Sequence, residues 1–173
     1  MYTISIASDR PANLPCRYNF MPQHSQWSRL FVRHMAEKLQ QLSAIKGELR
    51  VLSGLSLGAD QLFFLAALRA KRKGMSITIE ACIPCADYST NWPKKFRIAY
   101  KRLIELADKT TYISKENFDG GHCLLKRDTY MIRKSDLIIA LYEHKPNNTE
   151  LSISLAEQYH KHIIYFKPSD IEQ

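Results

Sequence analysis

The chain alternates between two hydrophobic patterns along its length. Short runs of apolar and β-branched residues predict strands, at residues 2–8, 48–54, 75–83, 109–114, 136–142 and 162–167. Between these runs, apolar residues recur every three or four positions and predict helices, at residues 27–47, 59–72, 92–107, 123–134 and 149–160. This alternation predicts an α/β fold, a doubly wound and mostly parallel sheet of about six strands with helices on both faces.

Length and composition fit one compact domain over residues 1–173. The chain is 45% hydrophobic and 24% charged, which is ordinary for a globular protein and argues against disorder. The first residues show no basic leader, and no run approaches the roughly 18 apolar residues of a membrane span. We therefore expect a cytoplasmic protein without a membrane partner.

The formal net charge of +8 favours anionic partners, whether nucleic acid, nucleotide or phosphate. The basic residues are scattered along the chain, so solvated helix faces explain them equally well. Cys82 and Cys85 form a C-x-x-C pair around Pro84, but the second ligand pair of a zinc site is missing. We interpret the cysteines as structural and expect no metal site and no cofactor.

The turn between the second strand and the second helix is a candidate anion site. It contains Ser53, Gly54, Ser56, Leu57, Gly58 and Asp60. Ligands of such sheets bind beyond the carboxyl ends of the strands, and backbone N–H groups at a helix start attract phosphate. The alternative is a tight turn at Gly54 and close packing at Gly58, with Asp60 adding favourable charge to the first helical turn.

Two further loops lie at the same predicted edge. Ser8, Asp9 and Arg10 follow the first strand, where Arg10 suits a phosphate and Asp9 a ribose hydroxyl, unless the two form a surface ion pair. In the loop over 143–152, Asn147 and Asn148 tolerate a left-handed backbone, and Thr149 is the expected N-cap of the next helix. This would place a second helix start at the same edge, although capping alone explains Thr149.

Trp92 and Arg127 complete the candidates. Trp92 stands beside Pro93 at the start of a predicted helix and suits stacking on a base, although packing is the usual role of such an aromatic residue. Arg127 lies on a predicted helix, where it either faces the crevice and holds a second phosphate or is a surface charge.

The order of these motifs resembles the YpsA-like family of the SLOG superfamily, a Rossmann-like group named for the SMF/DprA and LOG proteins. The matching residues are Arg10, the set Ser53, Gly54, Gly58 and Asp60, then Ile83, Pro84 and Trp92, then Arg127, Met131 and Asp136, and finally Thr149. The resemblance implies a Rossmann-like domain that binds a nucleotide or nucleotide-derived ligand related to ADP-ribose or NAD. It also implies a homodimer and a role in sensing or sequestering a signal in a phage or defence context.

This chain also departs from the family pattern. Ala7, Ser8 and Asp9 replace a Thr-Gly-His turn, and Asn147 and Asn148 replace two glycines. Ser152 stands where LOG enzymes carry their glutamate. We therefore expect binding rather than catalysis.

Two alternatives stay open. A nucleotide N-glycosidic hydrolase resembling LOG enzymes would need its carboxylate from Glu150 or Asp60. A single-stranded DNA binder resembling DprA would draw on the positive charge.

Overall fold

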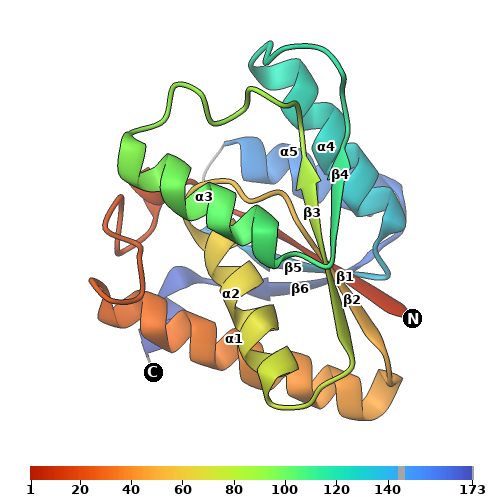
Figure 1. Cartoon of the computed structure of the whole chain (residues 1–173). Helices are drawn as coiled ribbons and strands as arrows, with labels where there is room; N and C mark the ends of the chain where they lie inside the picture. The colour runs from red at the N-terminus through yellow and green to blue at the C-terminus, as the bar shows by residue number, and fades with distance from the viewer. Residues whose placement is uncertain (144–146, 173) are drawn as a thin grey trace.

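The computed structural model describes residues 1–143 and 147–172 (Figure 1). The strands are β1 (Tyr2–Ser8), β2 (Leu49–Ser53), β3 (Ile77–Ile83), β4 (Lys109–Tyr112), β5 (Leu137–Leu141) and β6 (His162–Phe166). The helices are α1 (Gln26–Lys46), α2 (Ala59–Arg72), α3 (Lys94–Leu106), α4 (Gly121–Lys134) and α5 (Asn148–Gln158). Two short 3-10 helices, η1 (Pro11–Asn13) and η2 (Pro168–Glu172), had no counterpart in the sequence-based expectation.

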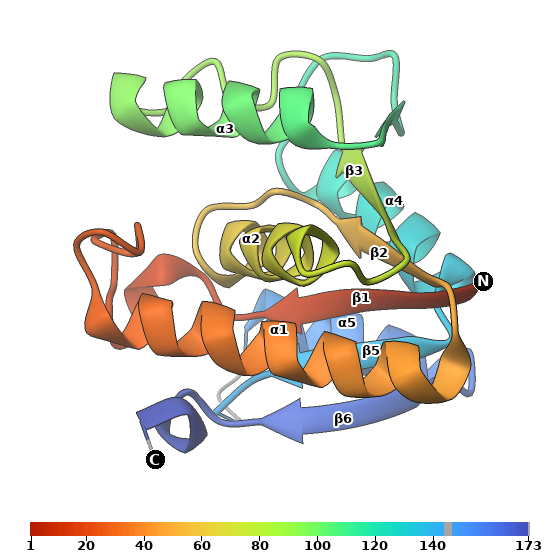
Figure 2. The same ribbon diagram turned by 60° about the horizontal axis from the view of Figure 1, so that its bottom comes forward.

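The six strands form one parallel sheet in the order β4-β3-β2-β1-β5-β6. Helices α1 and α2 lie together on one face, and α4 and α5 lie on the other (Figure 2). The chain moves outward from β1 to β4 and then crosses to β5, on the other side of β1. The strand order therefore reverses between β1 and β5, and the predicted doubly wound α/β fold is confirmed.

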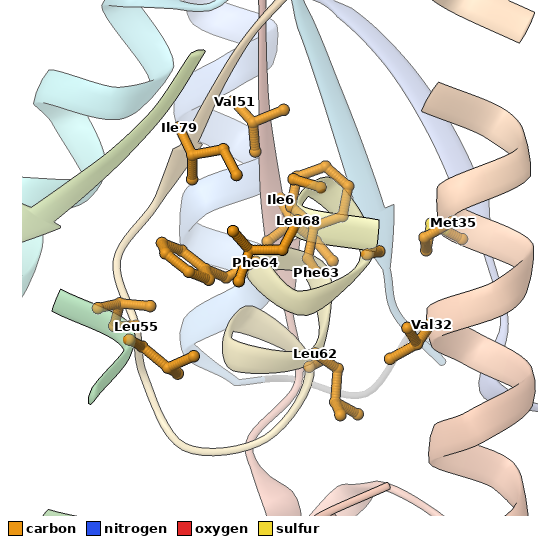
Figure 3. Packing of buried hydrophobic residues seen from close by; sticks show 14 of the residues in the cluster. Ile6, Val32, Met35, Val51, Leu55, Leu62, Phe63, Phe64, Leu68 and Ile79 are labelled. Atoms are coloured by element: carbon orange, nitrogen blue, oxygen red, sulfur yellow. The ribbon is translucent and has the colours of Figure 1, made fainter. Parts of the chain in front are cut away.

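The main core lies between the sheet and the α1–α2 layer. Ile6, Val51 and Ile79 come from three neighbouring strands and lie near the side chains of α2 (Figure 3). Phe63 and Phe64 of α2 are fully buried in this cluster. A large apolar side chain removed from water in this way contributes roughly 1.5–3 kcal/mol to stability.

The face of the sheet under α4 contains a buried charge. Glu80 in β3 is completely buried and accepts hydrogen bonds from Thr111 Oγ1 at 2.6 Å and Tyr130 Oη at 3.0 Å. Arg50 in β2 donates to the same carboxylate, through Nε at 3.0 Å and through Nη2. Burial opposes ionisation of Glu80, but the hydrogen bonds from Thr111 and Arg50 outweigh it and lower its pKa. The sequence analysis did not single out this cluster, which ties β2, β3, β4 and α4 together.

The two tryptophans lie in different parts of the fold. Trp27 in α1 stacks on Phe31 and donates a hydrogen bond from Nε1 to the carbonyl of Pro168 at 2.9 Å, which fixes η2 against α1. Trp92, before α3, packs edge-on against Tyr88 and Tyr100, with ring centroids 5.0 and 5.1 Å away. Among residues 1–143 and 147–172, no helix is both long and apolar enough to cross a membrane.

Candidate functional site

A pocket opens at the carboxyl end of β1, beside the point where the strand order reverses. It encloses about 50 Å³ and lies between the sheet, α4 and α5. Its lining residues are Ser5, Ile6, Ala7, Ser8, Asp9, Arg10, Ser56, Leu57, Asp60, Arg127, Asp128, Met131, Ile132, Ile138, Asn148, Thr149 and Ser152. The first, second and fifth predicted loops, which follow β1, β2 and β5, thus meet with α4 at one place.

Most of the predicted ligand-binding residues line this pocket: Ser8, Asp9, Arg10, Ser56, Leu57, Asp60, Arg127, Asn148 and Thr149. Ser53, Gly54, Gly58 and Trp92 are not part of its lining. Glu150, the other carboxylate considered for catalysis, is exposed and also lies outside the lining. Positions 144–146 of the fifth loop lie outside the described residues.

Internal hydrogen bonds shape the turn over residues 53–60. Ser53 Oγ accepts from the Leu55 N–H at 3.2 Å and donates to the carbonyl of Asp60 at 3.1 Å. Asp60 Oδ2 accepts from the Ser56 N–H at 3.2 Å. Leu55 takes a left-handed conformation, with φ at 52°, and is fully buried. Ser53 and the Asp60 backbone hold the turn together, while Ser56 and the Asp60 side chain face the pocket.

The two glycines of this turn make close packing contacts. A Cβ atom on Gly54 would lie 2.8 Å from Arg127 Cζ, so only glycine leaves room for that guanidinium. Gly58 precedes α2 with φ at 100°, and a Cβ there would lie 3.2 Å from side-chain atoms of Pro11 and Leu14. The space beside the two glycines is therefore filled by side chains of the protein and is not open to a ligand.

Arg127 enters the pocket from α4 with 4% of its surface exposed. Its Nη1 donates to Ser56 Oγ at 2.9 Å, and its Nε and Nη2 donate to Asp128 Oδ1 at 2.9 and 2.7 Å. Burial disfavours the charged guanidinium, but the charges of Asp128 and Asp60 outweigh burial and raise the pKa of Arg127. The arginine is a charged and fixed part of the wall.

The polar network extends from Arg127 in two directions. Ser56 Oγ lies 3.1 Å from Tyr88 Oη, which connects the 53–60 turn to the loop after β3. Asp128 Oδ2 accepts from Ser152 Oγ at 3.1 Å, which connects α4 to α5. The sequence analysis missed Asp128. Adjacent positions of a helix do not normally face each other, so the spacing gave no reason to expect Asp128 to pair with Arg127. Its position beside a pocket-facing arginine was the available signal.

Asn147 organises the start of α5. Its Oδ1 accepts from the N–H groups of Thr149 at 2.9 Å and Glu150 at 3.2 Å, so the N-cap is Asn147 and not Thr149. Its Nδ2 donates to Asp9 Oδ1 at 2.7 Å. Asp9 is 2% exposed and is held by this contact between the first and fifth loops.

Arg10 differs from Arg127 in its surroundings. It lines the pocket and is only partly buried. Within residues 1–143 and 147–172, its guanidinium makes no hydrogen bond or ion pair. Among the described residues of the lining, Arg10 is therefore a cation whose hydrogen-bond donors are available to a ligand, although its charge also acts on Asp60.

Asp60 is the acid with the most perturbed environment in the pocket. It is 6% exposed, and burial raises its pKa, although the charges of Arg127 and Arg10 and the Ser56 N–H act in the opposite direction. Asp9, Asp60 and Asp128 all line the pocket. In the described part of the chain, no group of three or more His, Cys, Asp or Glu side chains could hold a metal ion.

Within the part of the chain that the structure describes, the four cysteines are not joined by disulfides. Cys82 and Cys85 are fully buried, and burial raises the pKa of each thiol to about 12. Cys82 packs with Leu52 and Met131 under α4, whereas Cys85 belongs to the main core. The C-x-x-C pair is thus divided between two hydrophobic clusters.

Curated relatives carry no assigned activity in their names. A UPF0398 protein of Halalkalibacterium halodurans is 24% identical over 127 residues, which cover 70% of this chain and 67% of the relative. A UPF0398 protein of Bacillus cereus is 27% identical over 96 residues, covering 51% of each chain. One from Lactobacillus delbrueckii is 22% identical, covering 63% of this chain and 59% of the relative. These matches span from half to two thirds of the relatives' lengths.

A similar fold occurs in DNA processing protein A from Helicobacter pylori, whose structure describes single-stranded DNA binding. The TM-score is 0.58 at 17% identity, and the match covers 95% of this chain and 64% of the other. The model of the YspA SLOG family, YpsA, matches residues 16–168, from the segment before α1 through β6 to the start of η2. With this match over most of its length, the chain belongs to the YspA SLOG family.

Proposed function

We propose that the pocket binds a nucleotide or nucleotide-derived ligand, of the ADP-ribose or NAD-related class, through a phosphate group. The carrying observation is the guanidinium of Arg10, which has no hydrogen-bond or ion-pair partner within residues 1–143 and 147–172, at a pocket whose wall also carries the hydroxyl groups of Ser8, Ser56 and Thr149. Arginine is the preferred partner of phosphate, and hydroxyl groups complete such a site. The position supports the same proposal, because ligands of doubly wound sheets bind where the strand order reverses.

The size of the pocket decides how such a ligand would lie. Small-molecule sites usually enclose roughly 300–1,000 Å³, whereas this pocket encloses about 50 Å³. Only one small group, such as a phosphate, would enter beside Arg10. The remainder of the ligand would lie across the opening, over Leu57 and Asn148. Binding would serve to sense or sequester the nucleotide in the cytoplasm.

The test is calorimetric titration with ADP-ribose, NAD, AMP and ribose 5-phosphate. For any of these compounds that the wild type binds, Arg10→Ala should weaken the affinity about 10- to 100-fold. This is the usual effect of losing a hydrogen bond to a charged group. Arg33→Ala is the matched control, because this exposed arginine of α1 has only a 4.0 Å contact with Glu37. Equal affinities of both variants, or no binding of any compound to the wild type, would refute the proposal.

A hydrolytic function is the second candidate, and the carboxylates favour it. Asp60 is a buried acid with a raised pKa, and Asp128 lies beside Arg127, so the two carboxyl groups have different environments. Glycosidic cleavage uses such a pair, one as acid and one as base or nucleophile. Release of adenine or nicotinamide from AMP or NAD, lost in Asp60→Asn, would establish this function. Intact substrates after incubation with the pure protein would exclude it for these compounds.

Single-stranded DNA binding is supported by the net charge of +8. Such binding weakens steeply with salt, because phosphate contacts release counterions. A fluorescent oligonucleotide titrated from 20 to 200 mM salt would therefore show a large loss of affinity. The absence of binding at the lowest salt concentration would eliminate this candidate.

A further inference from the structure

A second and larger cavity lies away from the nucleotide pocket, between α2, α3 and the segment before α1. This groove encloses about 600 Å³, within the range of small-molecule sites. Its lining combines residues 18–24, three residues of α2 and one side of α3.

The base of the groove is apolar and well packed. Phe20 and Phe96 stack with their ring centroids 5.4 Å apart, and Leu62 of α2 is fully buried. Leu65 and Leu103 also line the groove. Phe20, Phe96, Leu62 and Leu103 pack beneath the groove, and Leu65, which is partly exposed, offers apolar surface that an alkyl chain could cover.

The rim of the groove is apolar and exposed. Tyr18, Ile98 and Leu106 are 55%, 48% and 47% exposed, and all three line the groove. Single exposed apolar residues are common, but their concentration around one cavity marks a binding surface. The uncovered hydrophobic area therefore lies next to a cavity that a ligand can enter.

The charged residues of the lining have one sign. Lys95 and Arg102 line the groove, and no aspartate or glutamate does. Within the described ranges, neither side chain has an ion-pair partner, although Lys95 Nζ lies 4.8 Å from the centre of the Phe96 ring. A second copy of the chain would bring the same basic groove and a net charge of +8, so repulsion opposes it as the occupant.

We propose that this groove binds one single-chain anionic amphiphile, an alkyl carboxylate taken from solution. Its chain would lie between α2 and α3 against Leu65, Ile98 and Leu106. Its carboxylate would lie at the rim, near Arg102 and Lys95. This site is separate from the pocket at β1 and does not depend on the nucleotide proposal.

The test is calorimetric titration with hexanoate, octanoate, decanoate and dodecanoate below their micelle concentrations. Each added methylene should tighten the dissociation constant about threefold to fourfold until the groove is filled. Decyltrimethylammonium, with an alkyl chain one carbon longer and the opposite charge, should bind at least tenfold more weakly than decanoate. Amide chemical shifts should change at residues 18–24, 61–65 and 95–106.

Two matched pairs of variants locate the site. Arg102→Gln should weaken decanoate binding several-fold, whereas Lys101→Gln, on the same helix but outside the lining, should stay within twofold. Ile98→Asp should weaken binding at least tenfold. Leu125→Asp, at a 52% exposed position of α4, should have no effect on decanoate binding. Circular dichroism should show that all four variants are folded.

Three results would overturn the proposal. One is the same decanoate affinity in Arg102→Gln and Lys101→Gln. Another is binding to phosphatidylglycerol vesicles without binding of monomeric decanoate, which would indicate a membrane surface. A third is a dimer, seen by sedimentation equilibrium, that Ile98→Asp dissociates, which would identify the groove as a contact between copies.

Discussion

The guanidinium of Arg127 lies directly against Gly54, so that a Cβ atom at position 54 would be 2.8 Å from Arg127 Cζ. The two residues are 73 positions apart, and Arg127 Nη1 also lies 3.4 Å from the carbonyl oxygen of Gly54. The space that a side chain at position 54 would fill is thus occupied by the buried guanidinium of Arg127 from α4. Gly54 does not line the pocket, but it leaves room for Arg127, which does.

Gly54→Ala should displace Arg127 and destabilise the protein by about 1–3 kcal/mol, the usual cost of overpacking. The measurement is the free energy of unfolding from urea denaturation. The cause is steric, because Gly54 has no positive φ. Gly121→Ala is the control, since a Cβ there meets nothing within 4 Å, and its effect should stay within about 0.5 kcal/mol.

A double-mutant cycle with Arg127→Ala separates this contact from general damage. If the clash is with the guanidinium, the two substitutions should be non-additive by at least about 0.5 kcal/mol. Additive effects would show that Gly54 is needed for another reason.

Asp60→Asn should make the protein more stable at neutral pH, because burial raises the pKa of Asp60 in the folded state. A carboxyl group of this kind contributes stability below its unfolded pKa of about 3.9, and this contribution is lost as the pH rises through the higher folded pKa. The asparagine can still accept from the Ser56 N–H. The stability advantage of Asp60→Asn should therefore grow from pH 4 to pH 8 in parallel urea titrations, and a constant difference would contradict it.

The fold was predictable because its signals are local and repeated. The apolar run over 136–142 needs no tertiary information to predict the buried strand β5, Leu137–Leu141. Glu80 shows the limit of such patterns. One acid in an apolar strand gives no indication of its partners, because Arg50 and Thr111 reach it only through the register of β2 and β4 against β3.

Glu80→Gln should destabilise the protein by roughly 2–4 kcal/mol at pH 7, since it leaves Arg50 without its carboxylate. The lowered pKa of Glu80 means that its contribution is present above the unfolded value of about 4.3 and is lost as the pH falls through the folded value. The difference between wild type and variant should therefore shrink in acid.

The control for that measurement is Glu37→Gln. Glu37 pairs with Arg33 at 4.0 Å on the exposed surface of α1, with side chains 56% and 61% exposed. Its replacement should change the unfolding free energy by less than about 0.5 kcal/mol. Similar losses in both variants would mean that burial does not distinguish the two pairs.

Asn147→Ala should cost about 1–2 kcal/mol, because α5 loses its N-cap and Asp9 loses its hydrogen bond. Asn147→Asp tests the second contact separately. It keeps the capping oxygen but places a carboxylate against Asp9, so it should be destabilising at pH 7 and less so at pH 4. Thermal unfolding at both pH values is the measurement, and equal losses at the two would argue against the Asp9 contact.

The site was less predictable than the fold, because several of its side chains form hydrogen bonds and ion pairs with one another. The sequence identifies which loops meet at the end of β1, but it does not show that Asp128 is paired with Arg127 or that Asn147 holds Asp9. Both relationships depend on side-chain directions across elements that are distant in sequence. Arg10 stood among several candidates, and only the structure distinguishes it from Arg127 by its lack of partners within residues 1–143 and 147–172.

The two tryptophans make the chain its own fluorescent reporter. Trp92 contacts Tyr88, whose hydroxyl lies 3.1 Å from Ser56 Oγ in the pocket wall, whereas Trp27 reports on the contact between α1 and η2. With Trp27 replaced by phenylalanine, the tryptophan emission, excited selectively over the tyrosines, comes from Trp92 alone, two contacts away from the candidate ligand. In the converse variant, Trp92→Phe, only Trp27 remains, so ligand occupancy and detachment of the carboxyl-terminal segment can be followed separately in the two unlabelled variants.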